Sequence, residues 1–162
     1  MVLGVLVAAA LVQTTVMPRF ALWGAVPNLM LAVVVSWSLR RGARQTAGIA
    51  LGGGLLLDLL SGGPFGAIAG PLVACSTAAT LGEFASLRES AWLPLAAAAL
   101  ATVVYGALQT IVLQVSMPHV DWLAGFARVL GPSIVANCVL VYPVYRALGA
   151  LVRSPGRVNG RW

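Results

Sequence analysis

Long apolar runs, separated by short polar connections, follow one another along the whole chain. Polar and apolar residues do not alternate within the runs, so the runs predict membrane-spanning helices and not the strands of a membrane barrel. They cover residues 2–17, 28–39, 45–66 with its closing turn, 65 or 66 to 81, 91–116 and 123–152. The pattern therefore predicts an all-helical integral membrane protein, a compact bundle of six transmembrane helices over residues 1–152, followed by a polar cytoplasmic tail at 153–162. The second run is shorter than the ~20 residues of a perpendicular span, so it begins earlier, near Leu22, or crosses a thinned bilayer.

The composition also favours a chain embedded in lipid. Hydrophobic residues make up 60% of the 162 residues, the mean hydropathy is +0.94, and 9% of the residues are charged. A soluble domain is about one quarter charged, so none is expected here. The net charge of +6 does not indicate nucleic-acid binding, because the arginines lie in short connections and at the tail, where they act as topology signals and contact lipid headgroups.

The positions of the arginines predict the orientation of the bundle. All ten basic residues are arginine, which together with the many alanines and glycines is typical of a G+C-rich bacterial genome. In a six-span scheme, one side of the membrane has Arg40, Arg41, Arg44, Arg88, Arg146, Arg153, Arg157 and Arg161. The connections on the other side carry only Arg19, with Arg128 inside the sixth run. The positive-inside rule then predicts a multi-pass protein of the bacterial inner membrane with both termini in the cytoplasm.

The stretch 45–66 is the most unusual of the apolar runs. It contains Gly48, Gly52, Gly53 and Gly54, one acid, Asp58, and a Gly-Gly-Pro turn at its end. Gly48 and Gly52 lie four residues apart and share a helix face, where another helix can approach backbone to backbone. An intramembrane acid is expected to face the interior of a bundle. Two interpretations stay open: a structural helix whose acid has a satisfied partner, or a site where these five residues bind a partner protein.

Polar side chains of several runs fall at similar depth in the six-span scheme, toward the outer surface. They are Gln13, Asp58, Gln109 and Arg128, and we expect them to form an intramembrane polar cluster. Asp58 and Arg128 have opposite charge, and each is costly alone in lipid, so we predict that they pair across the bundle. The alternative is that Arg128 snorkels outward alone while Asp58 is capped by glutamine or water.

The sixth run contains a predicted kink at Gly131-Pro132. Ser133 and Asn137 lie one turn apart beside it, and their side chains are expected to satisfy the backbone carbonyl that Pro132 leaves free, although a functional role stays open. We find no catalytic, cofactor-binding or metal-binding set, because the only histidine, His119, lies in a short connection and no second one could complete a metal site. The sequence predicts neither an enzyme nor a cofactor.

Four motifs together resemble a known family. They are Gln13 ahead of a proline; Pro27-Asn28-Leu29 running to Arg40-Arg41-Gly42; GGGLLLDLLSGGPFG at 52–66; and Pro132 with Asn137, followed by Tyr142-Pro143-Val144-Tyr145. Over nearly its whole length the chain is similar to the MreD family, small membrane subunits of the bacterial rod-shape machinery, the elongasome or Rod complex. The third motif is the most specific. The second departs from the family, which usually has aspartate where this chain has Asn28.

The resemblance implies a non-enzymatic subunit that binds MreC and, through the complex, MreB, RodA and a class B penicillin-binding protein, and so helps to regulate peptidoglycan synthesis and rod cell shape. It also implies a bundle similar to the substrate-binding subunits of energy-coupling-factor transporters. The competing hypothesis is therefore a small-molecule-binding transport subunit that uses Asp58, Gln109 and Arg128 as its pocket. Few aromatic residues lie at the outer helix ends to stack on a flat ligand, which favours the scaffold.

Overall fold

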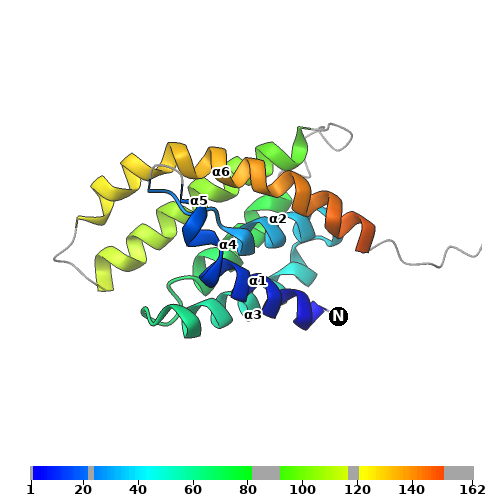
Figure 1. Cartoon of the computed structure of the whole chain (residues 1–162), viewed down its shortest axis with the longest axis horizontal. Helices are drawn as coiled ribbons and strands as arrows, with labels where there is room; N and C mark the ends of the chain where they lie inside the picture. Colours follow the sequence, from blue (N-terminus) through cyan, green and yellow to red (C-terminus); the bar gives the residue numbers. More distant parts are fainter. Residues whose placement is uncertain (1, 22–23, 82–91, 117–120, 152–162) are drawn as a thin grey trace, which may run out of the picture.

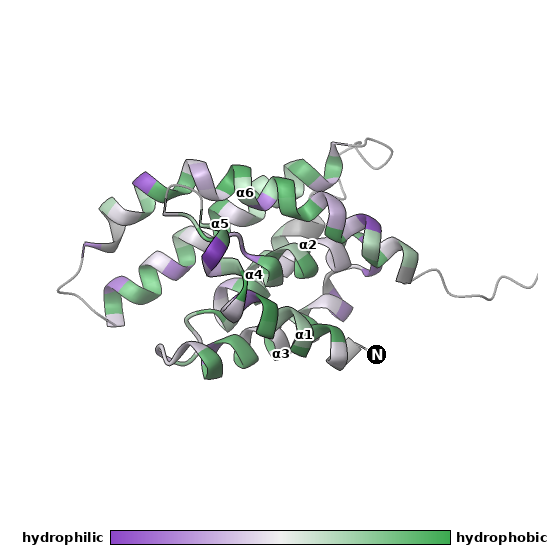
Figure 2. Cartoon of the chain, in the orientation of Figure 1, coloured by the Kyte–Doolittle hydropathy of each residue, from purple (hydrophilic) through white to green (hydrophobic). Residues whose placement is uncertain are grey.

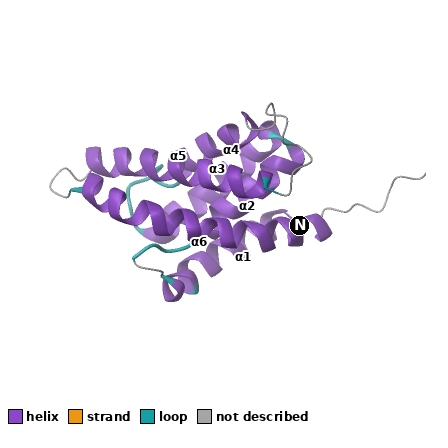
Figure 3. Ribbon diagram, turned by 90° about the horizontal axis from the view of Figure 1, so that it is seen from above, coloured by secondary structure: helices purple, strands orange, loops and turns teal. Residues whose placement is uncertain are grey.

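All regular structure in the described part of the chain is helical (Figures 1 and 3). The structure is a computed structural model, and it describes residues 2–21, 24–81, 92–116 and 121–151. The elements are α1 (Val2–Thr15), η1 (Met17–Phe20, a 3-10 helix), α2 (Leu29–Arg41), α3 (Ala43–Ser61), α4 (Ala69–Leu81), α5 (Leu93–Ser116) and α6 (Trp122–Leu151). The predicted all-helical class is confirmed, and each apolar run overlaps one of the six α-helices.

Two helices are long and apolar enough to cross a membrane by length and composition. They comprise Leu93–Ser116 in α5 and Ala124–Ala150 in α6. The helices α1, α2 and α4 have only 14, 13 and 13 residues, and at 1.5 Å per residue they reach about 20 Å. The predicted number of six crossings therefore stays a prediction.

The short helix α2 forms the centre of the molecule. Seven consecutive residues, Met30 to Ser36, are buried, and a helix that is apolar all round belongs in the interior of a bundle. Every other α-helix packs against α2, and beyond it the most extensive pairings join α5 to α6 and α3 to α4. The hydroxyl of Ser38 donates a hydrogen bond to the carbonyl of Ser76, 2.8 Å away, which ties α2 to α4. Because α2 is enclosed by its neighbours, its shortness reflects its place in the core.

The outer surface of the bundle is apolar, as a bilayer requires. Figure 2 shows hydrophobic residues along the helices, with polar residues between them. The side chains of Leu59, Ile111, Val115 and Val139 are each at least 60% exposed, on three different helices. The start of α1 and the end of α6 lie toward the same end of the molecule, while the end of α5 and the start of α6 lie at the other (Figures 1 and 3).

The end of α2 is fastened to the last turns of α6. The guanidinium of Arg40 donates a hydrogen bond to the carbonyl of Tyr145, 2.8 Å away, and lies 4.0 Å from the centroid of the Tyr145 ring. Gly149 makes room for this contact, because a Cβ there would collide with the guanidinium of Arg40. The motif Tyr142–Tyr145 thus supplies the partner of an arginine that topology alone assigned to lipid headgroups.

Candidate functional site

Asp58 is a buried capping residue. Its side chain is 3% exposed, and its carboxylate accepts hydrogen bonds from the backbone N–H groups of Gly66 (3.0 Å), Ile68 (2.9 Å) and Ala69 (3.2 Å). These groups belong to the turn before α4 and to the first residue of α4, whose N–H groups have no partner within the helix. The same bonds explain why α4 begins at Ala69 and not at residue 65 or 66: the intervening residues form a turn around the carboxylate.

The predicted pair between Asp58 and Arg128 does not form. Arg128 is exposed on α6, and both oxygens of Asp58 already accept backbone hydrogen bonds. The turn and the start of α4 follow Asp58 directly in the chain, so they satisfy the carboxylate without a distant cation. The structure thus agrees with the interpretation of Asp58 as an acid with a satisfied structural partner.

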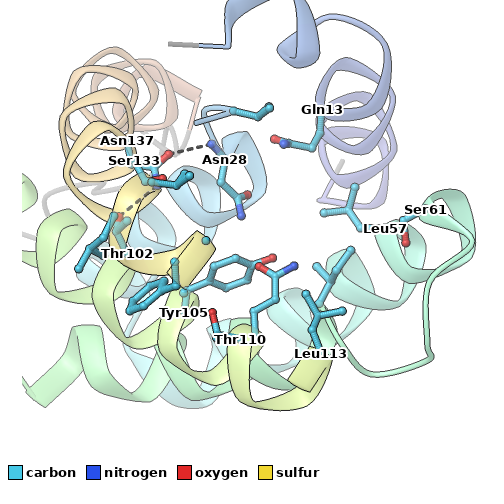
Figure 4. A pocket seen from close by; sticks show the side chains of 18 of the residues that line it. Gln13, Asn28, Leu57, Ser61, Thr102, Tyr105, Thr110, Leu113, Ser133 and Asn137 are labelled. Atoms are coloured by element: carbon cyan, nitrogen blue, oxygen red, sulfur yellow. Dashed lines mark hydrogen bonds between the residues drawn. The ribbon is translucent and has the colours of Figure 1, made fainter. Parts of the chain in front are cut away.

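A cavity of about 600 Å³ lies where α1 ends, α2 begins and α3 ends, between the second half of α5 and the first half of α6 (Figure 4). This volume is within the usual range for small-molecule sites. The residues that line it, none of them charged, are Gln13, Thr14, Pro18, Val26, Asn28, Leu57, Ser61, Ile68, Thr102, Tyr105, Gly106, Gln109, Thr110, Leu113, Gly125, Phe126, Val129, Leu130, Ser133 and Asn137. We take this cavity as the candidate functional site.

One wall of the cavity is a hydrogen-bonded network that joins three helices. The carbonyl oxygen of the Asn137 side chain accepts from the backbone N–H of Asn28 at 2.7 Å, and its amide group donates to the hydroxyl of Thr102 at 3.1 Å. The Asn28 side chain caps α2 by accepting from the backbone N–H of Leu31 at 2.9 Å. Figure 4 shows Asn28, Thr102 and Asn137 grouped on one side of the cavity.

Gln13 extends this network to α1. Its side-chain oxygen accepts from the backbone N–H of Leu29 at 2.5 Å, and its amide group donates to the carbonyl of Pro27 at 3.2 Å. Both bonds go to backbone groups at the start of α2. Gln13 and Asn28 therefore hold the first turn of the central helix, which fixes the position of the polar wall.

The structure brings together half of the predicted polar cluster. Gln13 and Gln109 both line the cavity, whereas Asp58 and Arg128 are not among its lining residues. The cluster was predicted because the four residues lie at similar depth in the six-span scheme. Depth alone does not determine which way a side chain faces. Asn28, Thr102 and Tyr105 were missed as lining residues; the signal for Asn28 was its place just before a helix, where asparagine favours capping.

The expected role of Asn137 as a repair of the Pro132 kink is wrong. Its side chain bonds to α2 and α5 instead, because it lies on the face of α6 that is turned toward them. The helix α6 continues through both Pro132 and Pro143. Ser133, its neighbour in the prediction, lines the cavity.

The glycines of α3 face two different environments. A Cβ on Gly53 would lie 2.6 Å from the sulfur of Met30, and one on Gly54 would collide with the backbone of Ala69. These two glycines let α3 pack closely on α2 and α4. A Cβ on Gly48, by contrast, would meet nothing within 4 Å, and one on Gly52 would lie 3.9 Å from Leu6. Gly48 is exposed, so only part of the predicted glycine set is available to a partner.

The described part of the chain contains no set of residues that could bind a metal ion. No group of three or more His, Cys, Asp or Glu side chains is close enough there to hold a metal ion. The only predicted loop histidine, His119, lies outside the described residues. The lining of the cavity consists of amide, hydroxyl and hydrocarbon groups, which can hold a small molecule by hydrogen bonds and apolar contacts.

The comparison with protein families gives one match over nearly the whole chain. The family model described as rod shape-determining protein MreD matches residues 1–153. The matched range includes every element of the described bundle and all residues of the cavity. Neither the search of curated proteins nor the search of solved structures found a match.

Proposed function

Because the chain belongs to the MreD family and therefore has a role in rod shape determination as a membrane protein, we propose that it is a non-enzymatic scaffold subunit of the bacterial elongasome. It binds MreC, a single-span protein with a periplasmic domain, and through it joins MreB, RodA and a class B penicillin-binding protein. In this role it helps to regulate peptidoglycan synthesis. The match to the MreD family carries the proposal, and the shape of the bundle supports it.

The topology that we propose has six crossings and both termini in the cytoplasm. The start of α1 and the end of α6 lie toward the same end of the bundle (Figure 1), which is compatible with an even number of crossings. Arg40 and Arg41 end α2, and Arg44 lies in the first turn of α3, so the positive-inside rule favours the cytoplasm for the junction of these two helices. The cavity then faces the periplasmic half of the membrane.

The outward face of α3 is the surface we propose for MreC. Gly48 is exposed there, and Leu51, Leu55 and Leu59, which follow at helical spacing, are 48%, 40% and 64% exposed. A small residue next to a row of leucines lets a partner helix approach closely and pack along the row. Gly53 and Gly54 are buried inside the bundle, so they contribute by holding α3 in place.

Co-purification tests this surface. In Gly48→Leu the new side chain projects into open space, so the bundle should insert and fold while the approach of a partner helix is blocked. We expect MreC to be lost from the tagged variant. The matched control is Gly131→Leu on α6, where a Cβ also meets nothing within 4 Å; it should retain MreC. Equal recovery of MreC with both variants would contradict the assignment of this face.

A second candidate function is the small-molecule-binding subunit of a transporter of the energy-coupling-factor type. The cavity of about 600 Å³ is the observation that favours it. Two aromatic side chains, Tyr105 and Phe126, line the cavity, and Tyr105 points across it in Figure 4. Depletion of the protein separates the two functions: a scaffold predicts rounding of rod-shaped cells with normal vitamin uptake, and a transport subunit predicts loss of uptake.

A further inference from the structure

We propose that the cavity binds an uncharged amphiphile from the membrane, a molecule with a hydroxyl-bearing head and a hydrocarbon body. The head binds the unused polar side chains of the lining, Gln109, Thr110 and Ser133, and the body lies against the apolar part of the lining. The inference goes beyond the scaffold function, since it concerns a small ligand and does not depend on MreC.

The lining of the cavity provides hydrogen-bonding groups that the protein itself does not use. The side chains of Gln109, Thr110 and Ser133 line the cavity, and in the described part of the chain none of the three has a hydrogen-bond partner. An amide and two hydroxyls can both donate and accept hydrogen bonds, so they match an alcohol. The network of Asn28, Thr102 and Asn137 holds the start of α2, α5 and α6 together around these groups.

The lining also has an extensive apolar part. It consists mainly of Leu57, Ile68, Leu113, Phe126, Val129 and Leu130. A ligand that is polar throughout would lose hydration against these side chains without gaining hydrogen bonds. A hydrocarbon body gains free energy by burial against the same surface. A lining that combines unused hydrogen-bonding groups with an extensive apolar surface therefore selects an amphiphile.

The absence of charge in the lining restricts the head group of the ligand to neutral groups. None of the lining residues is charged. Of the charged groups next to lining residues in the chain, Asp58 has its carboxylate occupied by backbone N–H groups, and Arg19 and Arg128 are exposed. A phosphate or ammonium head would be desolvated without a counter-charge, which is strongly unfavourable. Neutral alcohols of two lipid classes, glycerides and isoprenoids, share the chemistry that the cavity can recognise.

Binding of defined lipids to the full chain tests this proposal. The protein is purified in dodecyl maltoside and titrated with dioctanoylglycerol, with farnesol, and with dioctanoylphosphatidic acid as the charged counterpart, and the bound lipid is counted by native mass spectrometry. We expect saturable binding of one molecule of neutral lipid, and affinity for the phosphatidic acid at least about tenfold weaker. The neutral lipid that binds more tightly identifies the class of the ligand, glyceride or isoprenoid. Absence of binding by both, or equal binding of the phosphatidic acid, would overturn the proposal.

A matched pair of variants locates the bound lipid. Ser133→Phe fills the cavity from α6 without touching the network that joins the helices, and we expect it to abolish binding. Val135→Phe places the same side chain on the exposed face of α6, where Val135 is 58% exposed, and should bind as the parent does. Where Ser133→Phe does not yield folded protein, Thr110→Phe fills the cavity from α5 instead. Unchanged binding by a folded cavity-filling variant would show that the lipid lies elsewhere.

Discussion

At the scale of single residues, Asp58 shows how an acid can be stable inside an apolar bundle without a cation. Its charge is balanced by three backbone N–H groups of Gly66, Ile68 and Ala69, and hydrogen bonds to a carboxylate are stronger than those between neutral groups. The residue therefore fixes where the chain turns after α3 and where α4 begins. Its importance to the fold does not require contact with any partner protein.

Replacement of Asp58 should destabilise the bundle severely. In Asp58→Ala the three N–H groups lose their acceptor in a buried place, and each buried unsatisfied group costs about 1–3 kcal/mol. We expect the free energy of unfolding, measured by SDS titration in mixed micelles, to fall by at least about 2 kcal/mol. Asp58→Asn keeps one acceptor oxygen and should lose less. A stability of Asp58→Ala equal to that of the parent would show that the capping role is wrong.

Asn137 is the second residue on which the fold depends locally. Asn137→Leu removes both the acceptor for the Asn28 N–H and the donor to Thr102, so we expect a loss of about 1–3 kcal/mol in the same unfolding measurement. Thr102→Val is the control, because it removes only the bond to Asn137 and the bond to the Ala98 carbonyl and leaves the bond to Asn28 in place. The network assignment fails if Thr102→Val costs more than Asn137→Leu.

At the scale of elements, α3 carries two sets of glycines whose substitution should have opposite effects. In Gly54→Ala the new methyl group meets the backbone of α4 at Ala69, which cannot move aside cheaply, and overpacking of this kind costs about 1–3 kcal/mol. In Gly48→Ala the methyl group meets nothing, and alanine favours the helix over glycine by up to about 1 kcal/mol.

Thermal unfolding of the two variants in detergent measures this difference. We expect a lower Tm for Gly54→Ala and an unchanged or higher Tm for Gly48→Ala, with the parent protein between them. The comparison is direct, since both variants make the same chemical change in the same helix. A lower Tm for Gly48→Ala would mean that Gly48 packs against something inside the bundle and is not free for a partner.

The elements themselves were predictable from the sequence, and their neighbours were not. Solid apolar runs predicted all six α-helices, although the second run was predicted to end at Leu39 and α2 continues to Arg41. The central place of α2 was not evident, because its 13 residues suggest a short span as readily as an enclosed core helix. The start of α4 was placed too early, since an apolar turn such as 64–68 differs from a helix only through the carboxylate that organises it.

At the scale of the whole molecule, the sequence located the cavity only in part. The depth of polar residues in the six-span scheme selected Gln13 and Gln109, which line the cavity. It also selected Asp58 and Arg128, whose side chains face a turn and the exterior. Which residues converge on one space depends on how the helices are rotated and crossed, and this information lies in packing partners far apart in the chain, such as Asn28 and Asn137.

The crossing of the membrane by α3 is the most informative step of the topology to test. Its 19 residues reach about 28 Å at 1.5 Å per residue, close to the ~30 Å of a hydrocarbon core, although α3 is too polar to qualify by hydropathy alone. Single cysteines at its two ends, Arg44→Cys and Gly63→Cys, are introduced with Cys75→Ala and Cys138→Ala. Arg44 and Gly63 are both exposed, and neither has a positive φ.

We expect a membrane-impermeant maleimide to label Gly63→Cys in intact spheroplasts and Arg44→Cys only after the membrane is permeabilised. The physical reason is that α3 separates the two positions by one bilayer, with the arginine-rich end in the cytoplasm. Labelling of both from the same side would show that α3 does not cross, and the six-span topology would then be wrong. Labelling with the two sides exchanged would keep the crossing and reverse the orientation, which would place the cavity toward the cytoplasm.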